Sequence, residues 1–101
     1  MLHIVNKSPF ENRTLDTALR VAGNEQGAAL LLIEDAVYAA TKGATTEAMV
    51  KEAMGKLKVY ALWPDLEARG MQDRVIDGIK MVDYAGFVDL VAEHNTNQAW
   101  L

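Results

Sequence analysis

Two neighbouring carboxylates, Glu34 and Asp35, follow an apolar run and are the first candidates for chemistry. Paired carboxylates can act in catalysis or bind a metal ion. Adjacent residues at a strand end point in different directions, however, and Asp35 could cap the helix expected to follow. We therefore favour a structural role for both residues, and the catalytic interpretation stays open.

The two histidines, His3 and His94, could also transfer protons or bind a metal ion. His3 lies in an expected strand. His94 ends the last expected helix, where a partial positive charge is favourable. No carboxylate or second histidine stands at ligand spacing from either residue. The sequence therefore predicts packing or surface roles for both, no metal site and no cofactor.

Cysteine is absent from the chain, which excludes disulfides, thiolate metal sites and thiol nucleophiles. Phosphate-binding loops are missing too, because "NKSPFE" after the first expected strand contains no glycine. Ser8 lacks the flanking glycines of a nucleophile elbow. These residues supply no convincing catalytic site.

The chain of 101 residues is long enough for one domain, and its formal net charge is −4. Basic residues are scattered, with Lys51, Lys56 and Lys58 as the nearest approach to a cluster, so direct binding of nucleic acid is not expected. No apolar run approaches the roughly 20 residues that cross a bilayer. "MLHIVNKSPF" is not typical of a secretory signal. We expect a cytoplasmic protein that does not contact membranes.

The elements that would position these residues alternate along the chain. Short apolar runs predict strands at 2–6, 28–33, 57–63 and 79–83, with room for a last strand at 98–101. Helical spacing over 15–22 predicts a first helix that begins before residue 15, and spacing and end signals predict further helices at 36–42, 45–55, 64–70 and 84–94. This order predicts a single compact three-layer α/β domain, with a mostly parallel sheet of about five strands and helices on both faces.

Capping residues indicate where several of these helices begin. Ser8, with Pro9 and Glu11 after it, fits a helix start, while Asn12 and Thr14 fit a slightly later one. The remaining caps are expected from Asp35, from Thr45 or Thr46, and from Asp83.

The helix expected at 84–94 has one apolar face, formed by Tyr84, Phe87, Val88 and Val91. Packing against the sheet is the expected role of this face. A subunit interface through Tyr84 and Phe87 is the alternative, because aromatic residues are enriched at interfaces. The chain closes on Trp100 and Leu101, which we expect to be covered by the domain or by a partner.

Five stretches together resemble the DsrH/TusB family of sulfur-relay proteins: "MLHIVNKSPF", "LLLIEDAVYAA", "KVYALWPDLEARG", "VDYAGFVDL" and "QAWL". They follow the family order and span residues 1–101. The resemblance therefore implies a single DsrH/TusB-like domain over 1–101. The segments "NKSPF", "PDLEARG" and "VDYAGFVDL" are more similar to the sulfur-oxidation branch (DsrH) than to the tRNA-thiolation branch (TusB).

The resemblance implies membership of a hetero-oligomeric complex of the DsrEFH or TusBCD type. The partners it implies are a DsrE/TusD-like subunit, a DsrF/TusC-like subunit and a DsrC/TusE-like sulfur carrier. In that family the sulfur moves as a cysteine persulfide, and the main sulfur-carrying cysteine belongs to the DsrE or TusD subunit.

Many DsrH members have a cysteine in the first helix, and the matching position here is Ala18. Persulfide transfer needs a thiolate, which this chain cannot supply. The leading hypothesis is therefore a cysteine-free, non-covalent subunit of a sulfurtransferase complex in sulfur oxidation. The alternatives are a TusB-like subunit in 2-thiouridine formation at the tRNA wobble position, a homomeric interaction module, and a stand-alone enzyme that uses Glu34 and Asp35.

Overall fold

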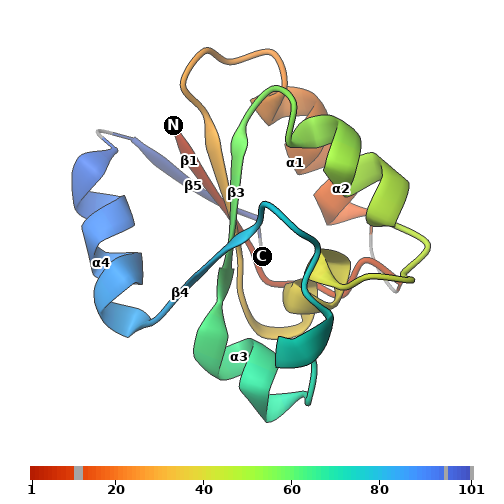
Figure 1. Cartoon of the computed structure of the whole chain (residues 1–101). Helices are drawn as coiled ribbons and strands as arrows, with labels where there is room; N and C mark the ends of the chain where they lie inside the picture. Colours follow the sequence, from red (N-terminus) through yellow and green to blue (C-terminus); the bar gives the residue numbers. More distant parts are fainter. Residues whose placement is uncertain (11–12, 95, 101) are drawn as a thin grey trace.

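Five strands form one sheet in which every neighbouring pair is parallel (Figure 1). The computed structural model describes residues 1–10, 13–94 and 96–100. Strand order is β4-β3-β2-β1-β5, with β1 Leu2–Val5, β2 Ala29–Leu32, β3 Lys58–Leu62, β4 Lys80–Val82 and β5 Asn97–Trp100. The fold class and all five strands are confirmed. The prediction for Leu101 lies outside the described residues.

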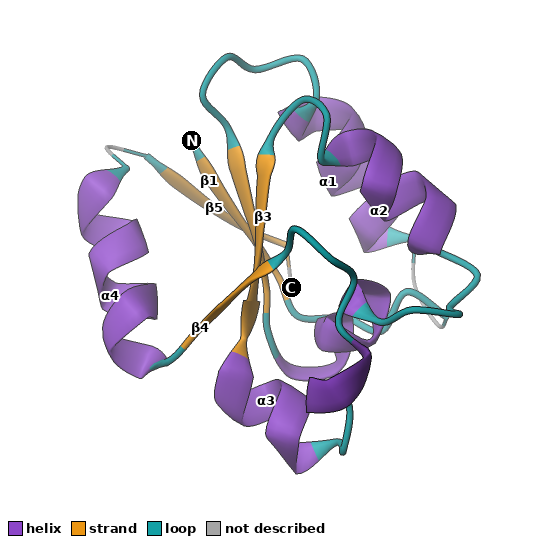
Figure 2. Ribbon diagram, viewed as in Figure 1, coloured by secondary structure: helices purple, strands orange, loops and turns teal. Residues whose placement is uncertain are grey.

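Helical segments connect the strands and lie on both sides of the sheet (Figure 2). They are α1 Thr14–Ala22, η1 Glu34–Ala40, α2 Glu47–Ala53, α3 Trp63–Ala68, η2 Gln72–Arg74 and α4 Tyr84–Glu93. Both η segments are 3-10 helices, so the α-helix expected at 36–42 is wrong in type, and η2 was not predicted. No helix among the described residues is long and apolar enough to cross a membrane.

Strand β2 is buried on both sides because it lies at the centre of the sheet. Side chains alternate along a strand. Leu30 and Leu32 therefore enter the hydrophobic cluster on one face, while Ala29 and Leu31 enter the cluster on the other. This double burial explains why "ALLL" is a continuous apolar run.

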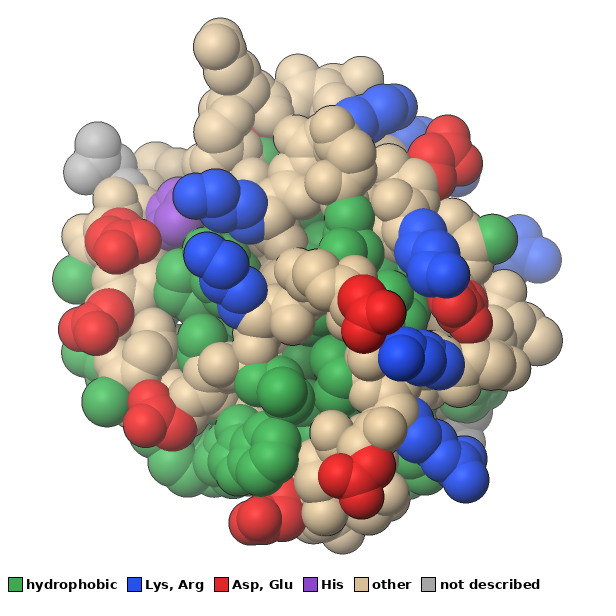
Figure 3. Space-filling model, in the orientation of Figure 1, with side chains coloured by type: hydrophobic (Ala, Val, Ile, Leu, Met, Phe, Trp, Pro, Cys, Tyr) green, Lys and Arg blue, Asp and Glu red, His purple; other side chains and the backbone are tan. Residues whose placement is uncertain are grey.

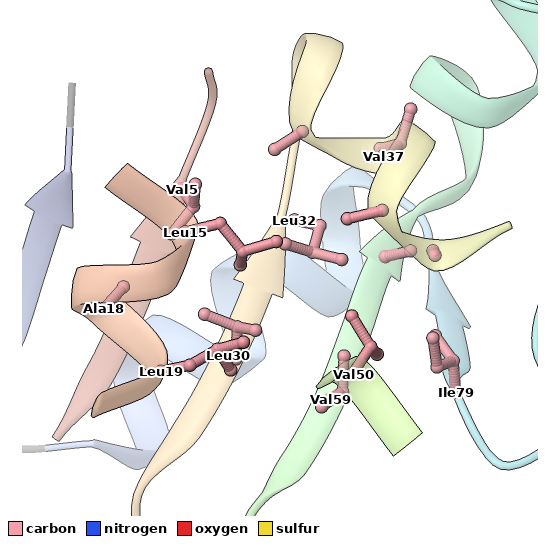
Figure 4. Packing of buried hydrophobic residues seen from close by; sticks show 14 of the residues in the cluster. Val5, Leu15, Ala18, Leu19, Leu30, Leu32, Val37, Val50, Val59 and Ile79 are labelled. Carbon is pink, nitrogen blue, oxygen red and sulfur yellow. The ribbon is translucent and has the colours of Figure 1, made fainter. Parts of the chain in front are cut away.

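The first face of the sheet is covered by α1, η1 and α2. Helix α1 is strictly two-sided, and the residues that it buries are Leu15, Ala18, Leu19 and Ala22. Figure 4 shows three of these residues beside Val5 of β1 and Leu30 of β2. The helical spacing read from the sequence therefore identifies the buried side of α1 correctly.

The second face is covered by α4, which crosses from β4 at one edge to β5 at the other (Figure 1). Leu90 is buried there, and Phe87 and Val91 are partly buried against the same cluster. Tyr84 and Val88 are 63% and 64% exposed, so the prediction that they share this packed face is wrong. Their positions on the helix turn them to its outer side.

The predicted caps have mixed outcomes. Helix α1 begins at Thr14, which agrees with the later start, but Arg13 takes the N-cap position, so the cap expected from Thr14 is wrong, as is the start at Ser8. Ser8 Oγ instead accepts a hydrogen bond from the Phe10 N–H at 3.2 Å, which closes a tight turn. Glu11 and Asn12 lie outside the described residues. Asp83 caps α4 as predicted, because its Oδ1 accepts from the Gly86 N–H at 2.8 Å.

Thr46 stands immediately before α2, but its side chain makes no capping hydrogen bond. Asp35 lies inside η1 rather than before it, and Ile33 takes the preceding position without a side-chain cap. The cap expected at Asp35 is therefore wrong, and its carboxylate binds elsewhere.

Candidate functional site

Ala18 lies on the inner side of α1, between Leu15 and Leu19, and is fully buried. It belongs to the larger hydrophobic cluster of the first sheet face. A side chain at this position points into the core rather than toward solvent (Figure 4). In this chain the position therefore supplies packing and no chemistry.

Glu34 and Asp35 lie at the carboxyl edge of the sheet, directly after β2. Glu34 has a φ of 49° and is the one non-glycine residue with positive φ in the described part of the chain. This left-handed conformation is unfavourable for most L-residues. The Glu34 N–H donates to Asp65 Oδ2 at 2.6 Å, and Glu34 Oε2 accepts from Asn6 Nδ2 at 3.3 Å. These bonds connect the ends of β1, β2 and β3.

Arg69, at the end of α3, holds the other carboxylate of the pair. Its Nε and Nη2 both donate to Asp35 Oδ1, at 3.1 Å and 2.8 Å. Its Nη1 also donates to the main-chain oxygen of Asp65 at 3.2 Å. Asp35 Oδ1 is therefore already occupied by two hydrogen bonds from the guanidinium. The arrangement braces η1 against α3.

No cluster of three or more His, Asp or Glu side chains in the described residues could hold a metal ion. Glu34 and Asp35 are exposed, and the second of them is neutralised by Arg69. The geometry thus agrees with the structural role favoured for the pair. The observed role differs in detail from the predicted helix cap. Glu34 connects the strand ends, and Asp35 pairs with Arg69.

His3 is completely buried on the first face of the sheet. The indole Nε1–H of Trp100 donates to His3 Nδ1 at 3.1 Å, and His3 Nε2 lies 3.0 Å from Glu25 Oε1. Because the indole can only donate, Nδ1 accepts and the imidazole proton sits on Nε2, which donates to Glu25. The histidine therefore links the first strand, the last strand and the turn after α1.

Trp100 is partly buried and packs against the larger core cluster. It lies opposite Val5 in the β1–β5 pairing, and its ring centroid is 6.1 Å from that of His3. Trp100 is thus partly covered by its own domain, and its role at a subunit interface stays a prediction. The chain end up to residue 100 is thus held by a strand ladder and a side-chain hydrogen bond.

His94 takes the C-cap position directly after α4. Its Nδ1 donates to the main-chain oxygen of Leu90 at 2.9 Å, which satisfies a carbonyl in the last turn. The prediction that His94 ends the last helix is confirmed. Sequence patterns do not identify Arg69 and Glu25 as partners, although the i,i+4 spacing of Asp65 and Arg69 in "PDLEARG" is a signal for the first.

Comparison with known proteins places this geometry in a family. The family model described as "DsrH like protein" matches residues 7–97. The chain belongs to the DsrH-like family. This DsrH-like chain is 37% identical to Protein TusB of Pectobacterium parmentieri and 39% identical to Protein TusB of Pectobacterium atrosepticum. Each alignment covers 99% of this chain and 100% of the relative. An Escherichia coli protein named TusB is 37% identical over the same lengths.

Solved structures show that the DsrH-like fold is shared more widely. The crystal structure of the ychN protein from E. coli matches with a TM-score of 0.83 and 20% identity, over 97% of each chain. A protein of unknown function from Methanobacterium thermoautotrophicum matches with a TM-score of 0.73 and 17% identity, over 97% of this chain and 95% of the other. At these identities the similarity concerns the fold alone.

Proposed function

We propose that this DsrH-like chain is a non-covalent subunit of a sulfurtransferase complex that serves 2-thiouridine formation at the wobble position of tRNA. Full-length similarity to proteins named TusB, in a chain without cysteine, carries the proposal. Persulfide sulfur passes from one sulfur atom to another. The chain therefore contributes by holding or presenting the subunits that carry the sulfur.

The pathway in this proposal differs from the leading hypothesis of the sequence analysis. Sulfur oxidation is not confirmed, because the curated relatives at 37–39% identity are named TusB. They support the alternative, tRNA thiolation. Short motifs such as "NKSPF" favoured the other branch, but each covers only a few residues, whereas the similarity to TusB extends over the whole chain.

The proposed partners are a TusC-like subunit, a TusD-like subunit that supplies the persulfide cysteine, and a TusE-like carrier. The net charge of −4 supports a route in which other proteins contact the tRNA. Because tRNA is a cytoplasmic substrate, the proposal carries a cytoplasmic location. The buried position of Ala18 supports a scaffold role, since this helix gives its inner side to the core.

Complementation tests the proposed pathway. The chain would be expressed, together with the TusC-like and TusD-like chains of its own organism, in a bacterial strain that lacks all three TusBCD subunits. Wobble 2-thiouridine would be quantified by mass spectrometry of digested tRNA. We expect thiolation to return, and to stay absent when only the TusC-like and TusD-like chains are supplied. Thiolation that does not depend on this chain would contradict the proposal.

Native mass spectrometry of the three co-expressed chains tests the proposed assembly separately. A complex that contains this chain and both partners is expected. Recovery of this chain as a free monomer or a homo-oligomer, while the other two subunits assemble without it, would contradict a hetero-oligomeric role. A homo-oligomer of this chain is the result that the homomeric interaction module predicts.

A further inference from the structure

Helix α4 is apolar on more of its circumference than the sheet can cover. Its exposed residues include Tyr84, Ala85, Val88 and Ala92, and we call these four the outer stripe. At 3.6 residues per turn, the outer stripe and the buried residues together span roughly 220° of the helix. A surface helix of a folded monomer needs a stripe of only about 100°. The outer stripe is thus apolar surface that the monomer does not use.

The charged residues of α4 are all acidic. Asp89 and Glu93 lie beyond the outer stripe, Asp83 caps the helix, and no Lys or Arg occurs from 83 to 93. Figure 3 shows acidic side chains along α4 at the left of the molecule, with hydrophobic side chains between and beside them. The surface is therefore an apolar stripe with a negative border.

This charge pattern disfavours pairing of α4 with a second copy of itself. In an antiparallel two-fold arrangement, Asp89 at the middle of the helix lies near its own copy, and Asp83 lies near Glu93 of the other chain. In a parallel arrangement each carboxylate lies beside its own copy. Like charges brought together in a partly desolvated interface weaken association. A partner with cations at these positions removes the conflict.

We propose that the outer stripe of α4 binds a chain of different sequence that presents an apolar patch bordered by Lys or Arg, with a cation opposite Asp89. The inference rests on the proposed function, which supplies partner subunits, and adds the surface that they use. Aromatic residues such as Tyr84 commonly anchor interfaces of this kind. Completing the apolar circumference of α4 is the physical reason for binding.

Three variants of the full chain test this surface against the purified TusC-like and TusD-like subunits of its own organism. Val88→Arg places a cation in the outer stripe, and Asp89→Lys reverses the charge at its border. Val21→Arg is the matched control, because Val21 is 40% exposed on α1, on the other face of the sheet. Circular dichroism would check that all three variants are folded, and calorimetry would give the dissociation constants.

We expect Val88→Arg to weaken binding by roughly a hundredfold and Asp89→Lys by roughly tenfold, with Val21→Arg equal to the unmodified chain. If all three variants bind like the unmodified chain, the surface is wrong while the proposed function stands. If the unmodified chain binds neither subunit, both this inference and the proposed assembly are wrong. Self-association that Val88→Arg abolishes and Asp89→Lys strengthens would show a homodimer instead, and would also overturn the inference.

Discussion

The two faces of the sheet bury β2 equally but are covered very differently. On the first face, α1, η1 and α2 bury a large cluster, and α1 turns a polar side to solvent. On the second face, α4 alone covers a smaller cluster, to which it contributes one buried residue, Leu90. The outer stripe of α4 remains exposed. The helices of the first face thus show the two-sided composition of surface helices in a monomer. Helix α4 on the second face has the wider apolar surface of a helix that is buried in an assembly.

Charges repeat this contrast. Helix α2 supplies both partners of an ion pair, because Lys51 Nζ lies 2.8 Å from Glu47 Oε2 at i,i+4 spacing. Helix α4 has acidic residues and no basic residue of its own. The helix with an internal ion pair thus covers the first face, and the helix with acidic residues alone covers the second.

The largest expected effect compares one residue from each helix. Leu15→Ala, on the inner side of α1, should lower the free energy of unfolding by about 3 kcal/mol, because it leaves a cavity in the hydrophobic cluster of the first face. Tyr84→Ala, on the outer stripe of α4, should change it by less than about 0.5 kcal/mol in the isolated chain. Urea unfolding of both variants measures the difference. Equal destabilisation would contradict the contrast between the two helices.

How much of this contrast was predictable can be judged from the same two helices. The inner side of α1 follows from its spacing, because apolar and polar residues separate cleanly around it. Helix α4 is apolar over too wide an arc for spacing to identify its buried side. The spacing therefore predicts that Tyr84 and Val88 pack against the sheet, whereas the structure turns them outward.

Long-range pairings were harder still to predict. Trp100 and His3 are 97 positions apart, and Asp35 and Arg69 are 34 apart. Sequence spacing carries no information about such contacts. The left-handed conformation of Glu34 was missed for a related reason, since positive φ is anticipated at glycine and not at glutamate. Elements and their order were predictable, whereas side-chain partners came only from the fold.

The next effect concerns Trp100 of β5, the edge strand beside β1, whose side chain packs on the first face. Trp100→Ala should lower the free energy of unfolding by about 2 kcal/mol, because a partly buried ring and its hydrogen bond to His3 are both lost. Trp100→Phe keeps most of the packing and should cost about 1 kcal/mol, largely for the unpaired His3 nitrogen. If both variants unfold like the unmodified chain, the side chain of Trp100 contributes no stability.

A third test asks whether the first helix could support sulfur chemistry at all. Ala18→Cys adds one sulfur atom to the core and should cost about 1 kcal/mol. Its thiol should react with a disulfide reagent at least about a hundred times more slowly than the thiol of Val21→Cys, which is on the exposed side of α1. Fast modification of the Ala18→Cys thiol in the folded chain would show that this position reaches solvent.

A substitution at the carboxyl edge of the sheet should have a smaller effect on the free energy of unfolding, and it should be stabilising. Glu34→Gly should raise the free energy of unfolding by about 0.5 kcal/mol, because glycine adopts a φ of 49° without strain. Glu34→Ala is the matched control, since it loses the same carboxylate and keeps the unfavourable conformation. Thermal unfolding of the two variants separates backbone strain from the contact with Asn6. Equal stability of both variants would indicate that the backbone here is not strained.

The smallest effect tests the ion pair of α2 through its pH dependence. A hydrogen bond with Lys51 lowers the pKa of Glu47 below its ordinary value of 4.5, and the same bond raises the pKa of Lys51 above 10.5. A lowered acid pKa stabilises the fold above the ordinary value and loses that contribution as pH falls through the folded-state pKa. A raised lysine pKa stabilises the fold below 10.5 and loses it as pH rises further. Lys51→Gln should therefore be slightly less stable than the unmodified chain between about pH 5 and pH 10, and equal to it in acid. A stability difference that persists in acid, below the folded-state pKa of Glu47, would assign the effect of Lys51 to packing rather than to charge. That result would remove the electrostatic part of the contrast with α4.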